Sequence, residues 1–319
     1  MSTSTAVRGA AVTAPVDPAP PPPRPARRNR NLRNALLFGA LIAPNLIVIL
    51  VFSYWPTIYN FYLSFTKWDL VDPTPTFVGL RNYLSMINDS RFHAALINTA
   101  IFTGVGTIVS LIGGILMGLL LATRIRFSGI VRTIAFAPHL LPGAAIGVLW
   151  LFIFDPTYGL SRVAFDLIGM DSPRWTTTSD WSVWAITVAY LWQRLGFVTI
   201  IYYTAILDLP KDVYEAAALD GATGWRLHRH LTLPLLSPAT LFLSITGLIG
   251  AAQAFDIIAT LTEGGPGDSS TTLSWLIYAD AFREFDVGAS AASATLMFLL
   301  LLVLTIIQLR IGDRSVHYQ

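Results

Sequence analysis

The chain has 319 residues, of which 54% are hydrophobic and only 13% are charged. A soluble domain carries about 25% charged residues, so this composition excludes an ordinary soluble protein and predicts a membrane protein. The net charge of +2, with basic residues spread along the chain, gives no indication of nucleic-acid binding. The lack of cysteine excludes disulfides and thiolate metal sites.

Six long apolar segments predict six transmembrane helices, because a bilayer core requires about 20 mostly apolar residues per helix. Their approximate bounds are 34–55, 95–122, 132–154, 181–207, 237–260 and 287–310. We therefore expect an all-α integral membrane protein whose transmembrane domain covers residues 34–310. Pro138 and Pro142 are expected to kink the third span.

The two ends of the chain are expected to be cytoplasmic tails. Residues 1–33 are basic and proline-rich, which predicts a disordered tail, and residues 311–319 follow the last span. Of the 21 Lys and Arg residues, fourteen fall on the side of the two tails, six on the other side and one inside the fourth span. By the positive-inside rule, both termini therefore face the cytoplasm.

The connection between the fourth and fifth spans, about residues 208–235, is the most patterned segment outside the membrane. Pro210 and Asp212 suit the first turn of a helix, and Gly221 suits the positive-φ residue that ends one. Thr223 suits the N-cap of a second helix. We expect two short helices at an angle on the cytoplasmic face.

The first of these short helices is acidic and rich in small side chains. Residues 211–221 contain one Lys against three acids, Asp212, Glu215 and Asp220. A helix that only rests on lipid is usually rich in Lys and Arg opposite bulky apolar residues. The pattern favours docking to a protein over the alternative of an interfacial helix.

The same loop carries a motif made of Glu215, Ala216, Ala217, Asp220, Gly221, Leu233 and Pro234. In this spacing, the motif resembles the EAA coupling loop of the permease subunits of binding-protein-dependent ABC importers. The segments Leu207–Pro210, Phe77–Tyr83 and Leu261–Pro266 are similar to the carbohydrate-uptake branch, which includes glycerol-3-phosphate and glycerophosphodiester importers. The resemblance extends over residues 34–310.

This resemblance implies a multi-pass plasma (inner) membrane protein that forms half of a translocation pathway for a sugar or glycerol-phosphate solute. No G-x-x-x-x-G-K-[ST] run is present, so the chain is expected to be no enzyme and to hold no cofactor. ATP and Mg would instead be bound by a partner ATPase dimer. The other implied partners are a second permease subunit, an extracellular solute-binding protein and membrane lipid, with no nucleic acid.

Polar residues inside the spans indicate where the pathway runs. Arg194 lies near the middle of the fourth span, where a charged residue normally faces the bundle interior or a wet cavity. Tyr190, Gln193 and Phe197 share its helical face. We predict that these four residues and Gln253 line the pathway, and Arg194 slightly favours an anionic solute. The alternative is a structural Arg194, satisfied by carbonyls or by an acid of the second permease.

Asp256 and the turn formed by Gly264, Gly265 and Pro266 fall at the outer end of the fifth span. We predict an outer gate or a contact with the binding protein there, although an ordinary surface turn would also explain the glycines. Two other pairs of glycines, Gly114 with Gly118 and Gly143 with Gly147, have the spacing of helix-packing motifs. No metal site and no catalytic residues are predicted.

Two other functional classes were weighed against the importer. A secondary transporter or channel that works without ATP would show internal repeats and several acids inside the spans. The sequence shows no such repeat, and only Asp256 lies inside a span. A membrane enzyme would require clustered polar catalytic groups, which the sequence does not provide.

Overall fold

The structure is a computed structural model, and it describes residues 27–123 and 127–315. The chain divides into two units, residues 1–56 and 57–319. The expected tail of residues 1–33 lies outside the described part up to residue 26, but residues 27–33 are helical. At the other end the last helix continues to Ser315, so it extends into the expected tail of residues 311–319.

Among the described residues, four helices are long and apolar enough to cross a membrane, and the number of spans rises to six if each of two bent helix pairs is one span. The predicted all-α membrane fold is confirmed, whereas the count of six spans stays a prediction. The four continuous spans are Leu37–Leu63, Ser90–Ala122, Ser179–Leu207 and Val287–Gly312, and the bent pairs are Ser128–Leu140 with Gly143–Ile153 and Gly224–Leu235 with Ser237–Ala252.

The first unit contains α1 (Arg27–Ile49) and the π-helix η1 (Leu50–Tyr54), and α2 (Trp55–Leu63) leads into the second. In the second unit the α-helices are α3 (Arg81–Ile87), α4 (Ser90–Ala122), α5 (Ser128–Phe136), α6 (Gly143–Ile153), α7 (Leu160–Asp166), α8 (Ser179–Leu207), α9 (Lys211–Leu219), α10 (Gly224–Leu227), α11 (Leu233–Leu235), α12 (Ser237–Ala252), α13 (Asp256–Leu261), α14 (Leu273–Phe282) and α15 (Val287–Ser315). The remaining elements are the 3-10 helix η2 (Ala137–Leu140), the π-helix η3 (His228–Thr232) and a small antiparallel hairpin of β1 (Thr66–Lys67) and β2 (Thr76–Phe77).

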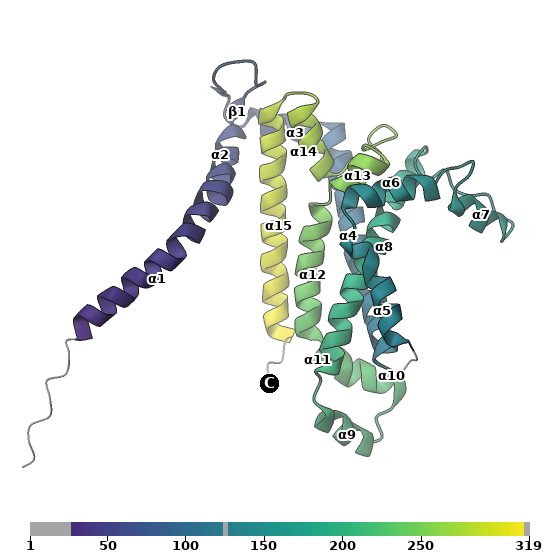
Figure 1. Cartoon of the computed structure of the whole chain (residues 1–319). Coiled ribbons are helices and arrows are strands. Elements are labelled where there is room, and N and C mark those ends of the chain that lie inside the picture. The colour runs from purple at the N-terminus through teal and green to yellow at the C-terminus, as the bar shows by residue number, and fades with distance from the viewer. Residues whose placement is uncertain (1–26, 124–126, 316–319) are drawn as a thin grey trace, which may run out of the picture. The chain divides into compact units, whose positions relative to one another are not determined.

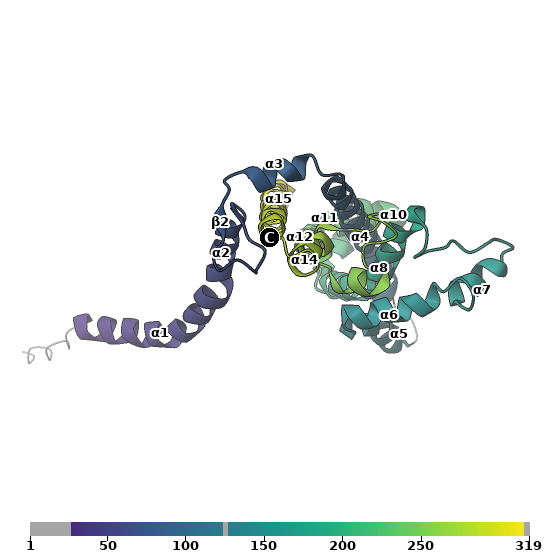
Figure 2. The same cartoon turned by 90° about the horizontal axis from the view of Figure 1, so that it is seen from above.

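The second unit is built around α4, α8, α12 and α15, which run through it side by side (Figures 1 and 2). α4 and α8 pack closely because glycines on α4 face α8. A Cβ added at Gly114 would lie 3.0 Å from the Cβ of Val198, and one at Gly118 would lie 3.1 Å from the Cβ of Tyr202. The predicted packing role of this glycine pair is confirmed.

The third predicted span is broken rather than continuous. The segments Ser128–Leu140 and Gly143–Ile153 meet at 104°. Leu141 is extended, with ψ of 141°, and Pro142 has no N–H with which to continue a helix. The kink expected from Pro138 and Pro142 is therefore confirmed, and it is a sharp corner.

The second glycine pair packs α6 against α13. A Cβ added at Gly143 would lie 2.9 Å from the Cβ of Asp256, and one at Gly147 would lie 2.8 Å from the Cβ of Thr260. Its predicted role in helix packing is also confirmed. The fifth predicted span, 237–260, is interrupted between α12 and α13, so the chain changes direction just before Asp256.

Candidate functional site

A polar pocket lies where α8, the end of α12, the start of α13 and the start of α6 meet. Its volume is about 230 Å³, and it is lined by Gly143, Tyr190, Gln193, Gly250, Gln253, Ala254, Phe255, Asp256 and Ile257. Four residues singled out from the sequence thus come together here, namely Tyr190, Gln193, Gln253 and Asp256. The pocket offers hydroxyl, amide and carboxylate groups as possible hydrogen-bond partners.

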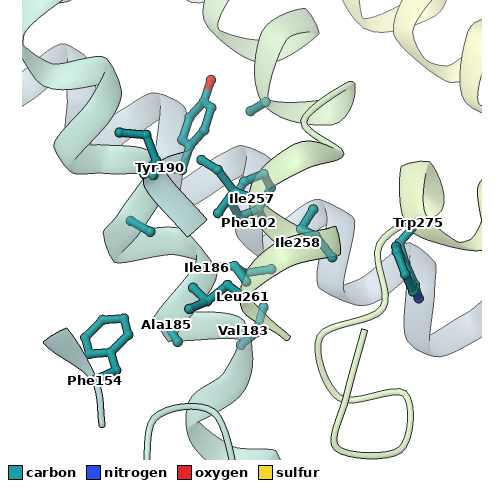
Figure 3. Packing of buried hydrophobic residues seen from close by; sticks show 13 residues of the cluster. Phe102, Phe154, Val183, Ala185, Ile186, Tyr190, Ile257, Ile258, Leu261 and Trp275 are labelled. Atoms are coloured by element: carbon teal, nitrogen blue, oxygen red, sulfur yellow. The ribbon is translucent and has the colours of Figure 1, made fainter. Parts of the chain in front are cut away.

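Tyr190 forms the border between this pocket and the apolar core. Its side chain is buried, and its ring packs at 5.1 Å from the ring of Phe102. Figure 3 shows its hydroxyl at the end of the ring that points away from the labelled apolar side chains. Gly250 lies beside that hydroxyl, because an added Cβ would be in ordinary van der Waals contact with it at 3.7 Å. The position of Tyr190 is thus fixed by packing, while its hydroxyl is left for the pocket.

Arg194 and Phe197 lie on the same helix but do not line this pocket. The guanidinium of Arg194 stacks over the Phe197 ring at 4.7 Å, and that ring also contacts His139, at 4.6 Å between centroids. Among the described residues Arg194 forms no ion pair, and its buried Nε and Nη2 have no hydrogen-bond partner. The predicted pathway role of both residues stays a prediction.

The coupling loop forms the two expected short helices at the end of the unit where α8 stops (Figure 1). α9 ends at Leu219. Gly221, two positions further, has φ of +74°, and the Ala222 N–H donates to the carbonyl of Ala217 at 2.9 Å. A glycine accepts this left-handed conformation without strain, as helix C-caps require. The Tyr214 hydroxyl lies 2.8 Å from the Thr232 hydroxyl and so ties α9 to η3.

The motif residues of this loop differ in exposure. Glu215, Ala216, Asp220 and Gly221 are exposed, Ala217 is half-buried, and of the later pair Leu233 is half-buried and Pro234 exposed. Leu219 was not singled out from the sequence, yet it is 91% exposed at the end of α9. Leu219 thus adds an apolar group to the exposed end of α9, and its place inside the motif was the available signal.

The loop of residues 262–272 is held tightly to the bundle. Gly264 has φ of +80° and is buried, because an added Cβ would lie 2.5 Å from Nε1 of Trp275. The amide of Asn98 on α4 donates to the carbonyls of Asp268 and Thr271 at 2.9 and 3.0 Å. Gly264 is therefore a packing residue, whereas Gly265 and Pro266 are half-buried in the adjoining turn. Their predicted contact with a binding protein stays a prediction.

A charge network that sequence reasoning missed joins α14 and this loop to the start of α4. Arg91 lies 3.5 Å from carboxylate oxygens of both Asp268 and Asp280, and it also pairs with Glu284. Burial raises the pKa of Asp280 to about 7, against the opposing effect of Arg91 and with further raising by Glu284 and Asp286. No sequence spacing connects these residues, so only the fold reveals the network.

Within the part of the chain that the structure describes, no group of three or more His, Asp or Glu residues could hold a metal ion. The two notable features of the described residues are a polar pocket lined in part by α8 and an exposed loop that follows the end of α8. Such an arrangement can admit a small polar solute and receive force from a partner. It is the arrangement expected of a membrane permease.

The chain belongs to the family of binding-protein-dependent transport system inner membrane components, whose sequence model matches residues 110–318. It is therefore a multi-pass inner-membrane protein and a permease subunit of the ABC importer type.

Several permeases match this chain over most of their own length. It is 34% identical to a probable ABC transporter permease of Pyrococcus horikoshii, over 82% of this chain and 91% of that protein. It is 33% identical to the sn-glycerol-3-phosphate transport system permease UgpA of Yersinia pestis and 32% identical to the trehalose/maltose transport system permease MalF of Thermococcus litoralis, each over 88% of this chain and 95% of the relative.

The fold is similar to that of a chain in the crystal structure of a bacterial ABC transporter that imports the acidic polysaccharide alginate. The TM-score is 0.78 at 23% identity, and the match covers 91% of this chain and 99% of that chain. At this identity the likeness establishes the fold, which is that of an ABC importer permease.

Proposed function

We propose that this chain forms half of the translocation pathway of an ATP-driven importer and that its pocket contacts the solute. The observation that carries the proposal is that α8 bears both functional regions. Its face supplies Tyr190 and Gln193 to the polar pocket, and its last residue, Leu207, lies four positions before α9 begins at Lys211. A partner that moves α9 therefore moves one wall of the pocket.

The coupling partner is an ATPase subunit that receives α9. The exposed carboxylates of Glu215 and Asp220 would pair with cations or amides of the ATPase, and Leu219 would enter an apolar part of its cleft. Support comes from the family, because its members are transport components that depend on a binding protein. The remaining subunits are an ATPase dimer, a second permease and an extracellular solute-binding protein. Both termini are placed in the cytoplasm by the distribution of basic residues.

The solute is a hydroxyl-rich molecule, and a neutral sugar is favoured over a glycerol phosphate. The named relatives serve both kinds of solute, since one is a trehalose/maltose permease and another an sn-glycerol-3-phosphate permease. The pocket wall presents the carboxylate of Asp256, which would repel a phosphate, whereas Arg194 stacks on Phe197 and lies outside the lining. The position of Asp256 in the pocket therefore favours a neutral solute over the anion that Arg194 slightly favoured in the sequence.

The test is transport by the assembled complex in proteoliposomes, with ATP enclosed and labelled trehalose, maltose or glycerol-3-phosphate supplied with the binding protein. We expect ATP-dependent uptake that Gly221→Ala lowers about 5- to 30-fold, because a Cβ in the left-handed region costs about 1–2 kcal/mol and shifts α9.

Gly169→Ala is a matched control for this substitution. Gly169 has φ of +73° and, like Gly221, would place an added Cβ in open space, so the backbone strain is the same while the position is remote from α9. Uptake that proceeds without ATP, or that both variants reduce equally, would refute coupling through this loop. Uptake confined to glycerol-3-phosphate would refute the neutral solute.

A further inference from the structure

The corner of the third span is attached to α8 along one face. We define the elbow as residues 137–142, which comprise η2 and the extended Leu141–Pro142 pair. The amide Nε2 of Gln193 donates to the carbonyl of Leu141 at 3.0 Å. One turn further, Gly196 permits the backbone of α5 to approach, because an added Cβ would clash with the carbonyl of Ala135 and lie 3.0 Å from Cα of Phe136.

The carbonyl of Leu141 depends on this bond for a structural reason. The chain leaves the 3-10 helix at Leu141, and the helix that follows begins only at Gly143. The Leu141 carbonyl therefore lies between two helices, and its one side-chain partner among the described residues is Gln193. A side-chain amide thus replaces the hydrogen bond that an unbroken helix would have supplied.

The bond also borders the solute pocket. Gln193 lines the pocket, as does Gly143 at the first position of α6, immediately beyond the elbow. Gly143 is in turn packed against Asp256 at the start of α13, where an added Cβ would lie 3.3 Å from Oδ2 of the carboxylate. This hydrogen bond therefore links α8 to the wall formed by α6 and α13, and it adds to the apolar core in which Ile146, Ile257 and Ile258 pack against α8.

We infer that Gln193 is a positioning residue that latches the elbow to α8 and passes the movement of the coupling helix to the pocket wall formed by α6 and α13. The inference rests on the proposed function. Without the latch, α8 still follows α9 and stays packed on α5 at Gly196, but the Leu141 end of the elbow follows α8 less closely. ATP hydrolysis then continues while the pocket changes its access less often.

The variant that isolates the latch is Gln193→Glu, since an ionised carboxylate keeps the size and the acceptors of the amide but cannot donate to a carbonyl. Gln253→Glu is the matched control. Gln253 lines the same pocket and is exposed, and no described partner accepts a hydrogen bond from its side chain. Both variants place an acid on the pocket wall, and only one breaks the bond to the elbow.

Two measurements separate the latch from a merely structural or solute-binding role. In proteoliposomes, Gln193→Glu is expected to lower the maximal uptake rate about tenfold, the fold-change for loss of one hydrogen bond, with solute-stimulated ATPase activity retained. Gln253→Glu is expected to change KM for the solute and to leave unchanged the number of solute molecules transported per ATP hydrolysed.

The second measurement reports on the elbow itself. Because the chain has no cysteine, Leu140→Cys provides a unique site for a nitroxide label on an exposed elbow residue. The label should become more mobile in the Gln193→Glu background and remain unchanged with Gln253→Glu. Acidification, which protonates the introduced carboxyl and restores a donor, should reverse the change.

The outcomes are distinct. Equal effects of the two variants on transport, or an unchanged label in Gln193→Glu, overturn the latch while leaving the importer in place. Absence of ATP-dependent uptake by the wild-type complex overturns the proposed function, and the coupling role of Gln193 with it. Size-exclusion elution of each complex at the wild-type position shows that a loss does not arise from misassembly.

Discussion

Gly196→Ala is the most direct test of how closely α8 and α5 approach each other. The added methyl group would meet only backbone, namely the carbonyl of Ala135 and Cα of Phe136. No change of rotamer can relieve this contact, so the two helices must separate. Two glycines on α4 complete a graded series. At Gly113 an added Cβ would lie 2.9 Å from the flexible end of Leu195, and at Gly104 it meets nothing within 4 Å.

The expected magnitudes follow from two opposing contributions. Replacing a helical glycine by alanine stabilises the folded state by about 1 kcal/mol through helix propensity. Overpacking against a rigid neighbour destabilises it by about 1–3 kcal/mol, and occasionally by more. For Gly104→Ala only the first contribution applies. Gly196→Ala should have a net destabilisation of about 2 kcal/mol, with Gly113→Ala close to zero because the Leu195 side chain can turn away.

The assay is the apparent Tm of each variant in the same detergent, followed by size-exclusion chromatography of a fluorescent fusion. At about 2–4 °C per kcal/mol, Gly196→Ala should melt roughly 4–8 °C below wild type and Gly104→Ala slightly above it. If Gly196→Ala and Gly104→Ala have the same Tm, α5 does not lie against α8 at Gly196, and the attachment of the elbow is wrong as well.

Two further predictions concern the ends and the middle of the bundle. Burial raises the pKa of Asp280 to about 7, so the folded protein keeps a proton on this carboxyl that the unfolded chain loses near pH 4. The free energy of unfolding should therefore fall as pH rises from about 4 to about 7 and level off above pH 7. Asp280→Asn should flatten that slope in apparent Tm, and an unchanged slope would contradict the burial. A Cβ added at Gly247 would lie 4.0 Å from the Cβ of Thr107, within the range of about 3.5–4.5 Å for disulfides, so Gly247→Cys with Thr107→Cys should cross-link on oxidation. The pair Gly247→Cys with Gly104→Cys should not, and gel mobility before and after reduction distinguishes the two.

The sequence was sufficient for features that rest on local physics. Apolar length located the spans, and the turn preference of Gly221 located the end of α9. The glycine spacing of Gly114 and Gly118 indicated a packed face, although it could not identify α8 as the partner. The proline pair located the corner in the third span, because a missing N–H disrupts a helix in any environment.

Features that depend on tertiary placement could not be obtained in this way. Arg194 stood out because a midspan charge is rare, yet the neighbouring Gln193 carries the contact with the pocket and the elbow. Which of the two neighbours faces inward depends on the rotation of α8 about its own axis. The Leu141 carbonyl, which lies between two helices and accepts a hydrogen bond from Gln193, has no signature in the sequence. The network around Arg91 likewise joins residues almost two hundred positions apart, as its pair with Glu284 shows.

The movement of a rigid helix such as α8 changes the shape of the pocket only where a neighbouring segment can bend. The geometry of the chain indicates where that segment lies. From Leu207 at the end of α8 to Gln193 the helix rises about 21 Å at 1.5 Å per residue, and it moves as one body because α4 packs against it through Gly114 and Gly118. Displacement of α9 should therefore arrive at Gln193 undiminished. At that level the neighbouring span is interrupted between η2 and α6, so the dihedrals that join these two helices can change without unwinding either of them. Conversion is expected at the elbow, where the bond from Gln193 adds to the apolar packing that holds α6 and α13 against α8.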